Sequence, residues 1–403
     1  MFKGFMDNFQ HNLFKPILLF FYMGFLVPIL GVEFEFPHVI YQGLTIYLLV
    51  SIGWHGGEEL AKLEPTVLTQ ALKFMGVGFL TNFVIGIAAY LTLRAVTKLR
   101  RIDAATVAGY YGSDSAGTFA TCVGVLAGLV RLGKPEFNYA PYMPVMLAVM
   151  EIPGCLVALF LVSRLRASGM DALGHMPDED GYDPNAVAPV FNGEGEEGHG
   201  HSGPTSKGTQ LGELGHESLK KKKPPGMLSG ELLHEVFLNP GLFLLFGGII
   251  IGFISQKQGS NVTVEDDKLF LGLFQGLLCL FLLEMGMTAS RKLKDLKRGG
   301  IPFIMFGLLA PIVFATLGIT VAHLFSMAIH QELQLGTYVL FSVLCAASSY
   351  IAVPAVQRLA IPEASPTLPL AASLGLTFSF NVTIGIPIYI EISKALMKAF
   401  PAT

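Results

Sequence analysis

The chain has 403 residues, of which 52% are hydrophobic and only 14% are charged. Soluble domains carry about 25% charged residues, and the mean hydropathy of +0.56 here indicates a membrane protein. The formal net charge is -3, and the sequence resembles no zinc finger or other nucleic-acid module. These features exclude the nucleic-acid-binding class.

Four cysteines, Cys122, Cys155, Cys279 and Cys345, lie inside apolar runs and never pair at short spacing. This pattern favours small core residues over a disulfide framework or a metal knuckle. The N-terminal stretch begins with charged residues and continues into apolar ones without a small-residue cleavage site. It predicts a first membrane span that is retained.

Apolar stretches of about 17 to 25 residues, long enough to cross a bilayer, recur along the chain. They lie near 13–31, 38–56, 71–93, 103–130 and 139–163, and again near 232–254, 268–288, 300–327, 335–357 and 367–397. We therefore predict an all-α polytopic membrane protein with about ten transmembrane helices. The predicted units are a first membrane repeat at 1–166, a linker at 167–229 and a second membrane repeat at 230–403.

The predicted linker is rich in Gly, Pro, Asp, Glu and His. Such a segment buries too little apolar surface to offset its chain entropy, so we expect it to be flexible. His199 and His201 lie near Glu194, Glu196 and Glu197, a combination that suits a metal ion. A solvated acidic segment is the favoured interpretation of the same composition.

Lysine and arginine cluster after the third span, at 94–101, and after the seventh, at 291–298. Because basic residues concentrate in cytoplasmic loops, these ends and the long central loop are predicted to be cytoplasmic. Both termini are then outside, an orientation that Lys3 and Lys15 oppose.

Five spans per half mean that the second half enters the membrane from the opposite side, the common plan of secondary transporters. Internal similarity supports this division. The stretch SIGWHGGEEL at 51–60 echoes EMGMTASRKL at 284–293, and YYGSDSAGTFA at 110–120 aligns with LCAASSYIAVP at 344–354. In this alignment Ser115 corresponds to Ser349. The sequence therefore predicts two inverted five-helix repeats.

Asp114 lies in the middle of an apolar span, where an ionised side chain costs about 3 kcal/mol or more. Its neighbours are poor helix-interior residues that can unwind a turn: Gly112, Ser113, Ser115, Gly117 and Thr118. Exposed backbone groups are tolerated in a membrane only where they line an enclosed cavity. The pattern predicts a broken helix with a functional carboxylate.

The second half has a matching stretch, in which Ala347, Ser348 and Ser349 precede Tyr350 and Pro354. Two breaks at equivalent positions of inverted halves predict one central site. Half-helix N-termini suit a small anion, while carbonyls, hydroxyls and a carboxylate suit sodium. Close helix packing through small residues is the alternative, and it leaves Asp114 unexplained.

Three more polar residues are candidates for this site. Glu151 precedes Pro153, and it is either a second ion ligand or a satisfied structural acid. Asn381 and Thr383 lie in the last span and are predicted to line the site. The candidate anion-binding residues are Ser113, Ser115, Gly117, Thr118, Ala347, Ser348 and Ser349, and the candidate sodium ligands are Asp114, Ser115, Ser349, Glu151, Asn381 and Thr383.

Four motifs in chain order resemble those of the sodium-dependent bicarbonate transporter family best known from cyanobacteria. YGSDSAGT at 111–118 resembles FGxxSGST, MEIPG at 150–154 resembles MDIPA, and EMGMTASRK at 284–292 resembles IMGMEAxxR. AASSYIAVPAVQRLAIPEASP at 346–366 resembles ASSSDISGPP followed by GIPSANP. The resemblance covers nearly all of the membrane part.

The resemblance implies a homotrimer in the plasma (inner) membrane that couples inward sodium movement to bicarbonate uptake. Sodium would be the coupling ion, no other cofactor is implied, and a PII-like cytoplasmic protein often regulates the family. By position, Ser115 and Thr118 match the family's first serine-rich element. Ser348 and Ser349 match the family's second serine-rich element. Glu151 matches the aspartate that precedes the proline in the family's MDIPA motif.

One departure from the family concerns the acid of its second element, which falls at Tyr350 here, while Asp114 stands where the family has an apolar residue. Either Asp114 serves the same cavity from the other half, or the coupling ion or the anion differs. The alternatives are therefore sodium- or proton-coupled symport of another small anion, an anion channel or a sensor.

DSAG superficially resembles a nucleophile motif, but hydrolysis needs a paired base and no equally buried histidine is evident, so we expect no enzyme.

Overall fold

The computed structural model describes residues 14–186 and 240–401. Within these ranges the chain is helical and contains no strand, which confirms the all-α prediction. The first half contains α2 (Pro16–Ile29), α3 (His38–Ala61), α4 (Pro65–Val96), α5 (Arg101–Tyr111), α6 (Ala116–Arg131), the short η1 (Pro135–Phe137) and α7 (Met143–Ala167). The second half contains α10 (Pro240–Gln258), α11 (Ser260–Phe270), α12 (Phe274–Lys292), η3 (Leu293–Gly299), α13 (Gly300–Ala328), α14 (Leu335–Ala346), α15 (Ala352–Ala360), α16 (Thr367–Leu370), η4 (Ala371–Phe378), η5 (Asn381–Gly385) and α17 (Ile386–Ala399).

Seven helical stretches in the described ranges are long and apolar enough to cross a membrane, so the chain is a multi-pass membrane protein. Each of the ten predicted ranges overlaps a helix, but three of them miss these criteria. α2 and α14 are apolar but shorter; the 14 residues of α2 span about 21 Å. α3 carries His55, Glu58 and Glu59, which lower its hydropathy. The ten-crossing arrangement therefore stays a prediction.

α11 is a helix where the sequence predicts a loop, between the spans at 232–254 and 268–288. Its sequence, SNVTVEDDKLF, is polar and acidic. It is held against α3 by two hydrogen bonds: Trp54 Nε1 donates to Asp267 Oδ1 over 2.9 Å, and the Tyr47 hydroxyl donates to the Leu269 carbonyl over 2.6 Å. These contacts with another helix stabilise a segment whose own composition gives no helix signal.

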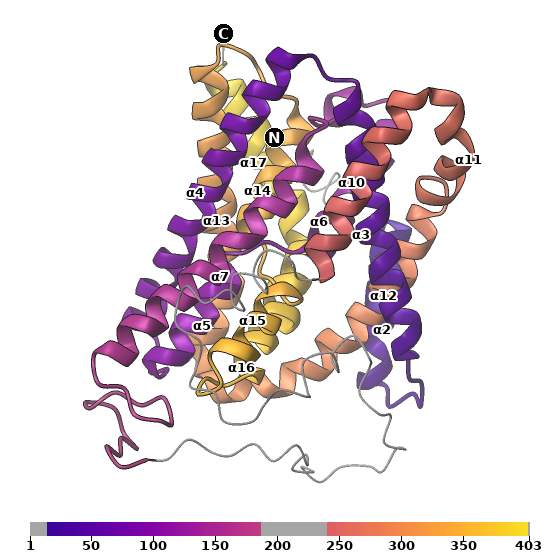
Figure 1. The fold of residues 1–403 in the computed structure, drawn as a ribbon. Coiled ribbons are helices and arrows are strands. Elements are labelled where there is room, and N and C mark those ends of the chain that lie inside the picture. Colours follow the sequence, from indigo (N-terminus) through magenta and orange to yellow (C-terminus); the bar gives the residue numbers. More distant parts are fainter. Residues whose placement is uncertain (1–13, 187–239, 402–403) are drawn as a thin grey trace.

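α2 packs along α12 and α3 packs along α10, on the right of Figure 1. Glycines let these backbones approach closely. A methyl group on Gly53 of α3 would collide with the Leu245 carbonyl of α10, and one on Gly286 of α12 would collide with the Phe21 carbonyl of α2. We call α2, α3, α10 and α12 the outer group. The sequence alignment of the two halves pairs Gly53 with Gly286, so equivalent glycines make equivalent contacts.

The other long helices form a second group, which we call the inner group. In the first half α4, α5 and α7 pack against one another, and in the second half α13 packs against α14 and α17. Residues 112–115 separate α5 from α6, and residues 347–351 separate α14 from α15. Figure 1 shows α14 above α15 near the centre of the molecule. The four cysteines are buried and unpaired within the described residues, as their apolar surroundings predict.

Residues 168–186 form a segment that is attached to the start of α5. The Asp171 carboxylate accepts the backbone N–H groups of Leu173, His175 and Asp183 over 2.8 to 2.9 Å, and Glu179 Oε1 accepts that of Arg101 over 2.8 Å. Burial acts to raise the pKa of Asp171, but the three N–H donors outweigh it and the pKa lies below its ordinary value. This segment belongs to the predicted flexible linker, whose remainder, including His199 and His201, lies outside the described residues.

Candidate functional site

The first break lies between the end of α5 at Tyr111 and the start of α6 at Ala116. Ser115 has an extended backbone, with φ of -142° and ψ of 114°, and acts as the N-cap of α6. Its hydroxyl oxygen accepts the Thr118 N–H over 3.3 Å and the Thr118 hydroxyl over 3.0 Å. This cap starts a new helix and leaves the residues before it outside regular structure.

Asp114 is fully buried in this break. Neither of its carboxylate oxygens has a hydrogen-bond partner among the described residues. Glu151 of α7 lies close enough to repel it, and no basic side chain in the described part of the chain offsets the charge of either acid. Because an unpaired buried carboxylate is very costly, the pair requires a bound cation or a proton.

Around this pair, α7 and the first break are joined through backbone carbonyls. The Ser113 hydroxyl donates to the Glu151 carbonyl over 2.7 Å, and Asn82 Nδ2 of α4 donates to the Met150 carbonyl over 2.9 Å. Pro153 lies inside α7 and removes one donor from its backbone. Side chains of the first break and of α4 therefore satisfy the carbonyls of α7 that lie close to Pro153.

The second break lies between the end of α14 at Ala346 and the start of α15 at Ala352. It meets the end of α5, where the Ser349 N–H donates to the Tyr110 carbonyl over 2.9 Å, and we call this meeting point of the two breaks the crossing. Three carbonyls of this stretch are capped by side chains. Ser373 Oγ donates to those of Ser348 and Ser349 over 2.7 and 2.9 Å, and Asn381 Nδ2 donates to that of Ala346 over 2.9 Å.

Ser373 and Asn381 both lie in π-helical segments, η4 and η5. A π-helical turn is wider than an α-helical one and is frequent at functional sites. Here the two segments carry the residues that hold the second break in place. Asn381 is among the residues predicted from the sequence to line the site, whereas Ser373 and Asn82 are not, although each is a polar residue inside an apolar span and could have been found by that signal alone.

Most of the predicted site residues meet at this crossing. Ser113, Asp114, Ser115, Gly117 and Thr118 come from the first break and the start of α6, and Ala347, Ser348 and Ser349 come from the second break. Glu151 adjoins them through Asp114. Thr383 is placed differently: its hydroxyl donates to the Ser379 carbonyl one turn earlier over 2.6 Å, and no hydrogen bond among the described residues joins it to either break.

Tyr350 stands where the family that the motifs resemble has an acid, and its side chain extends from the second break to the first. Its hydroxyl lies so close to Gly117 that a methyl group there would collide with it. The ring packs edge-on against Phe378, with the ring centroids 5.6 Å apart. The second break therefore contributes a phenol group to the start of α6.

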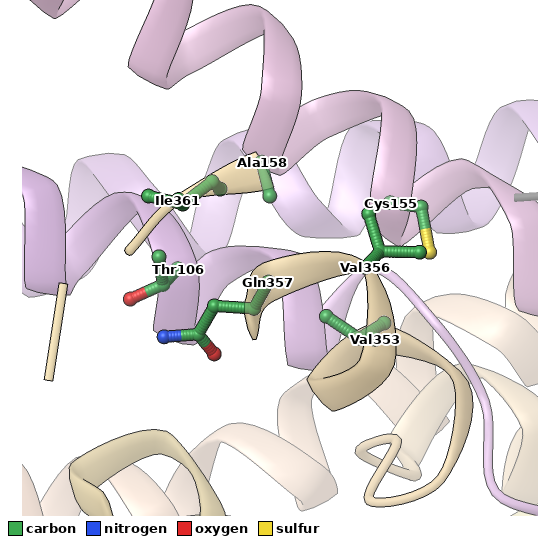
Figure 2. A pocket seen from close by; sticks show the side chains of 7 residues that line it. All are labelled: Thr106, Cys155, Ala158, Val353, Val356, Gln357 and Ile361. Carbon is green, nitrogen blue, oxygen red and sulfur yellow. The ribbon is translucent and has the colours of Figure 1, made fainter. Parts of the chain in front are cut away.

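Two narrow, apolar cavities flank the crossing. One lies between α5, α7 and α15, and Figure 2 shows Thr106, Cys155 and Gln357 among its lining side chains. Gln357 is buried, and its Oε1 has no hydrogen-bond partner among the described residues. The other cavity lies between α3, α12 and the start of α6, at the boundary between the outer and inner groups.

The chemistry of the crossing suits small ions. Within the described ranges no group of three or more His, Cys, Asp or Glu side chains is placed to hold a metal ion. The donors here are a carboxylate pair, hydroxyls and backbone groups, which suit a hard cation, while the N-terminus of α6 favours negative charge.

Comparison with curated proteins gives no significant match. A family model described as the Na+-dependent bicarbonate transporter superfamily matches residues 16–394, nearly the whole chain. This match agrees with the resemblance of the four sequence motifs, and it supports a transporter rather than an enzyme. The protein therefore belongs to the Na+-dependent bicarbonate transporter superfamily.

Proposed function

We propose that the protein is a secondary active transporter that couples inward sodium movement to bicarbonate uptake at the crossing of the two breaks. The observation that carries this proposal is the fully buried Asp114 carboxylate, both of whose oxygens lack a partner among the described residues. The superfamily supports the choice of cargo and coupling ion.

Sodium binds between the two breaks, near Asp114, Ser115 and Ser349, and neutralises the carboxylate. Bicarbonate then binds at the start of α6. The first amides of a helix have no intrahelical partner and attract an anion. Binding sodium first removes the repulsion between the anion and Asp114, which explains why the two ions move together.

Alternating access follows from movement of the outer group against the inner group around this fixed site. The matched contacts of Gly53 and Gly286 support two inverted repeats, because an exchange of the halves leaves the contact pattern unchanged. Each elementary charge that crosses gains about 2.3 kcal/mol per 100 mV. The sodium-to-bicarbonate ratio therefore sets how steep a gradient the protein can build.

The direct test is uptake of labelled bicarbonate into proteoliposomes with and without an inward sodium gradient. Asp114→Asn keeps the volume but loses the charge, so we expect its half-saturating sodium concentration to rise about 30-fold or more, from about 2 kcal/mol of lost charge interaction. Asp180→Asn, an exposed acid outside the site, is the matched control. Sodium-independent uptake by the wild-type protein, or unchanged sodium dependence in Asp114→Asn, contradicts the proposal.

Proton-coupled transport of a small anion is the second candidate. It is favoured by the proximity of Asp114 to Glu151 without a basic neighbour in the described residues, because two such acids readily share one proton. An inward proton gradient would then drive uptake without sodium. The same proteoliposomes, loaded at a higher pH than the outside buffer and free of sodium, distinguish the two candidates.

The homotrimer and the PII-like regulator are further proposals, which rest on the family alone. Mass photometry of the purified protein tests the trimer. Pull-down with a PII-like protein, with and without nucleotide, tests the regulator. The cytoplasmic side of the central loop is tested by labelling single cysteines introduced at Lys220 and Lys223 in a background without the four native cysteines.

A further inference from the structure

The Tyr350 hydroxyl lies against the first turn of α6. The side chain is 8% exposed, and its hydroxyl approaches the Ser115 side chain and the Gly117 amide. The hydroxyl nevertheless makes no hydrogen bond of standard geometry with the described residues. A buried phenol normally finds a partner, so this hydroxyl is placed for a group that the described residues do not supply.

The surroundings show which group fits. Two of the first amides of α6 are already used, since the Thr118 N–H bonds to the Ser115 hydroxyl and the Phe119 N–H to the Ser115 carbonyl. The remaining amides of the first turn, those of Ala116 and Gly117, have no partner within the helix and favour negative charge, and that of Gly117 faces the Tyr350 hydroxyl oxygen. The Tyr350 hydroxyl stands beside the second of them, and an O–H donor there complements an oxyanion.

The Tyr350 side chain is packed against aromatic rings on one side and borders a narrow cavity on the other. The Tyr350 ring lies edge-on to Phe378, which contacts Phe21 of α2 with ring centroids 5.9 Å apart. The narrow cavity on the other side is lined by Gly117 and Phe281 as well as by side chains of α3. The phenol therefore stands between the first turn of α6 and the boundary that separates the outer from the inner group.

We propose that Tyr350 is a specificity-determining residue, whose hydroxyl donates a hydrogen bond to a planar oxyanion held by the first amides of α6. This inference rests on the proposed function, because it concerns the anion of that same site. Gly117 is part of the device, since any side chain there would displace the hydroxyl. In this arrangement Tyr350 of the second half donates a hydrogen bond to the anion, and the Asp114 carboxylate of the first half binds the cation.

The test compares Tyr350→Phe with wild type, using the full-length purified protein in detergent at constant sodium concentration and pH. Thermal stabilisation is titrated with bicarbonate, nitrate, sulfate and formate, and uptake is measured in proteoliposomes. For the anion that stabilises wild type, the half-saturating concentration should rise about tenfold in Tyr350→Phe, which corresponds to about 1.4 kcal/mol. The half-saturating sodium concentration, measured at saturating anion, should stay within about twofold of the wild-type value. The melting temperature without anion should stay within about one degree of the wild-type value.

Tyr338→Phe is the matched control, because Tyr338 is a buried tyrosine at the other end of α14 whose hydroxyl bonds to His323 Nδ1 over 3.1 Å. It should lower the melting temperature and leave anion binding unchanged. Gly117→Ala should weaken anion binding like Tyr350→Phe. Gly128→Ala, in the same helix but with open space around it, should not.

The outcomes separate the inference from the proposed cargo. If nitrate or formate stabilises wild type and bicarbonate does not, the cargo is wrong, and Tyr350→Phe still tests the donor on the anion that binds. If anion affinity in Tyr350→Phe stays within twofold of wild type, or sodium affinity falls more than anion affinity, the inference is wrong. It is also wrong if none of the four anions stabilises wild type.

Discussion

The two helix breaks occupy equivalent places in the two halves but are held together in different ways. At the first, glycines bring backbones together: a methyl group on Gly154 of α7 would collide with the Gly109 carbonyl and with Ser113. At the second, side chains of Ser373 and Asn381 cap the carbonyls of the break itself, whereas the carbonyls capped beside the first break belong to α7. The first break therefore keeps a carboxylate that has no partner among the described residues, whereas three carbonyls of the second break already accept hydrogen bonds.

This difference suggests separate roles for the two breaks in the proposed mechanism. Carbonyls that accept strong hydrogen bonds are poorer ion ligands, so in the proposed mechanism the Asp114 carboxylate, which has no partner among the described residues, carries the greater part of the interaction with a cation. The second break instead supplies the Ser349 amide that joins the halves and the phenol of Tyr350. A pair of carboxyl groups, Asp114 and Glu151, thus belongs to one half only.

Gly154→Ala should have the largest effect, because the added methyl group meets backbone atoms that cannot move independently. We expect a loss of about 3 kcal/mol or more in stability, seen as poor expression and a lower melting temperature in detergent. Gly128→Ala, whose methyl group meets nothing within 4 Å, is the control. Equal melting temperatures for the two variants would contradict glycine-dependent packing at the first break.

Asn381→Ala should be the next most harmful change. It leaves two buried groups without partners, the Ala346 carbonyl and the Tyr389 hydroxyl, which donates to Asn381 Oδ1 over 2.6 Å. We expect about 2 to 3 kcal/mol of destabilisation, measured by thermal unfolding. Thr383→Ala, which removes only a bond within one helix, should change stability by about 0.5 kcal/mol or less. A reversed order would show that Thr383, not Asn381, supports the site.

Ser373→Ala removes the one hydroxyl that caps the Ser348 and Ser349 carbonyls. We expect a loss of about 1 to 2 kcal/mol and a half-saturating sodium concentration much closer to wild type than that of Asp114→Asn. Thermal unfolding and sodium-dependent uptake measure the two quantities. A sodium defect as large as that of Asp114→Asn would place the main cation ligands in the second break.

The smallest effect concerns the segment that is attached to the start of α5. The pKa of Asp171 is lowered in the folded protein, so its stabilising contribution is fully present above the unfolded value of 3.8 and is lost as the pH falls through the folded pKa. Amide hydrogen exchange at 171–183, corrected for intrinsic rates, should increase below about pH 3.8, while α5 itself remains protected. Asp171→Asn should show faster exchange already at pH 6, unlike Asp180→Asn. Equal protection in both variants would show that the carboxylate does not hold the segment.

Several features of the fold follow from the sequence because their causes are local. The lengths of the apolar runs indicate membrane crossing, and Gly112 and Ser115 around Asp114 indicate where one helix stops and another begins. Hydropathy does not by itself establish ten crossings, since α3 carries Glu58, which interacts with α11, and Glu59, which pairs with Lys62. α11 itself is absent from the prediction, because contacts with α3 stabilise it rather than its own composition.

The partners at the site are decided by the three-dimensional packing. Ser349 meets Tyr110 across more than 200 residues, Ser113 meets Glu151 across 38 residues and Ser373 meets Ser348 across 25. Thr383 and Asn381 are two residues apart, yet only Asn381 reaches the break, because rotation about a helix axis directs neighbouring side chains to different faces. The sequence by itself predicts that Asp114 is a buried charge with a functional role. Only the packed helices show that its oxygens have no partner in the described chain and that Tyr350 reaches the same site from the opposite half.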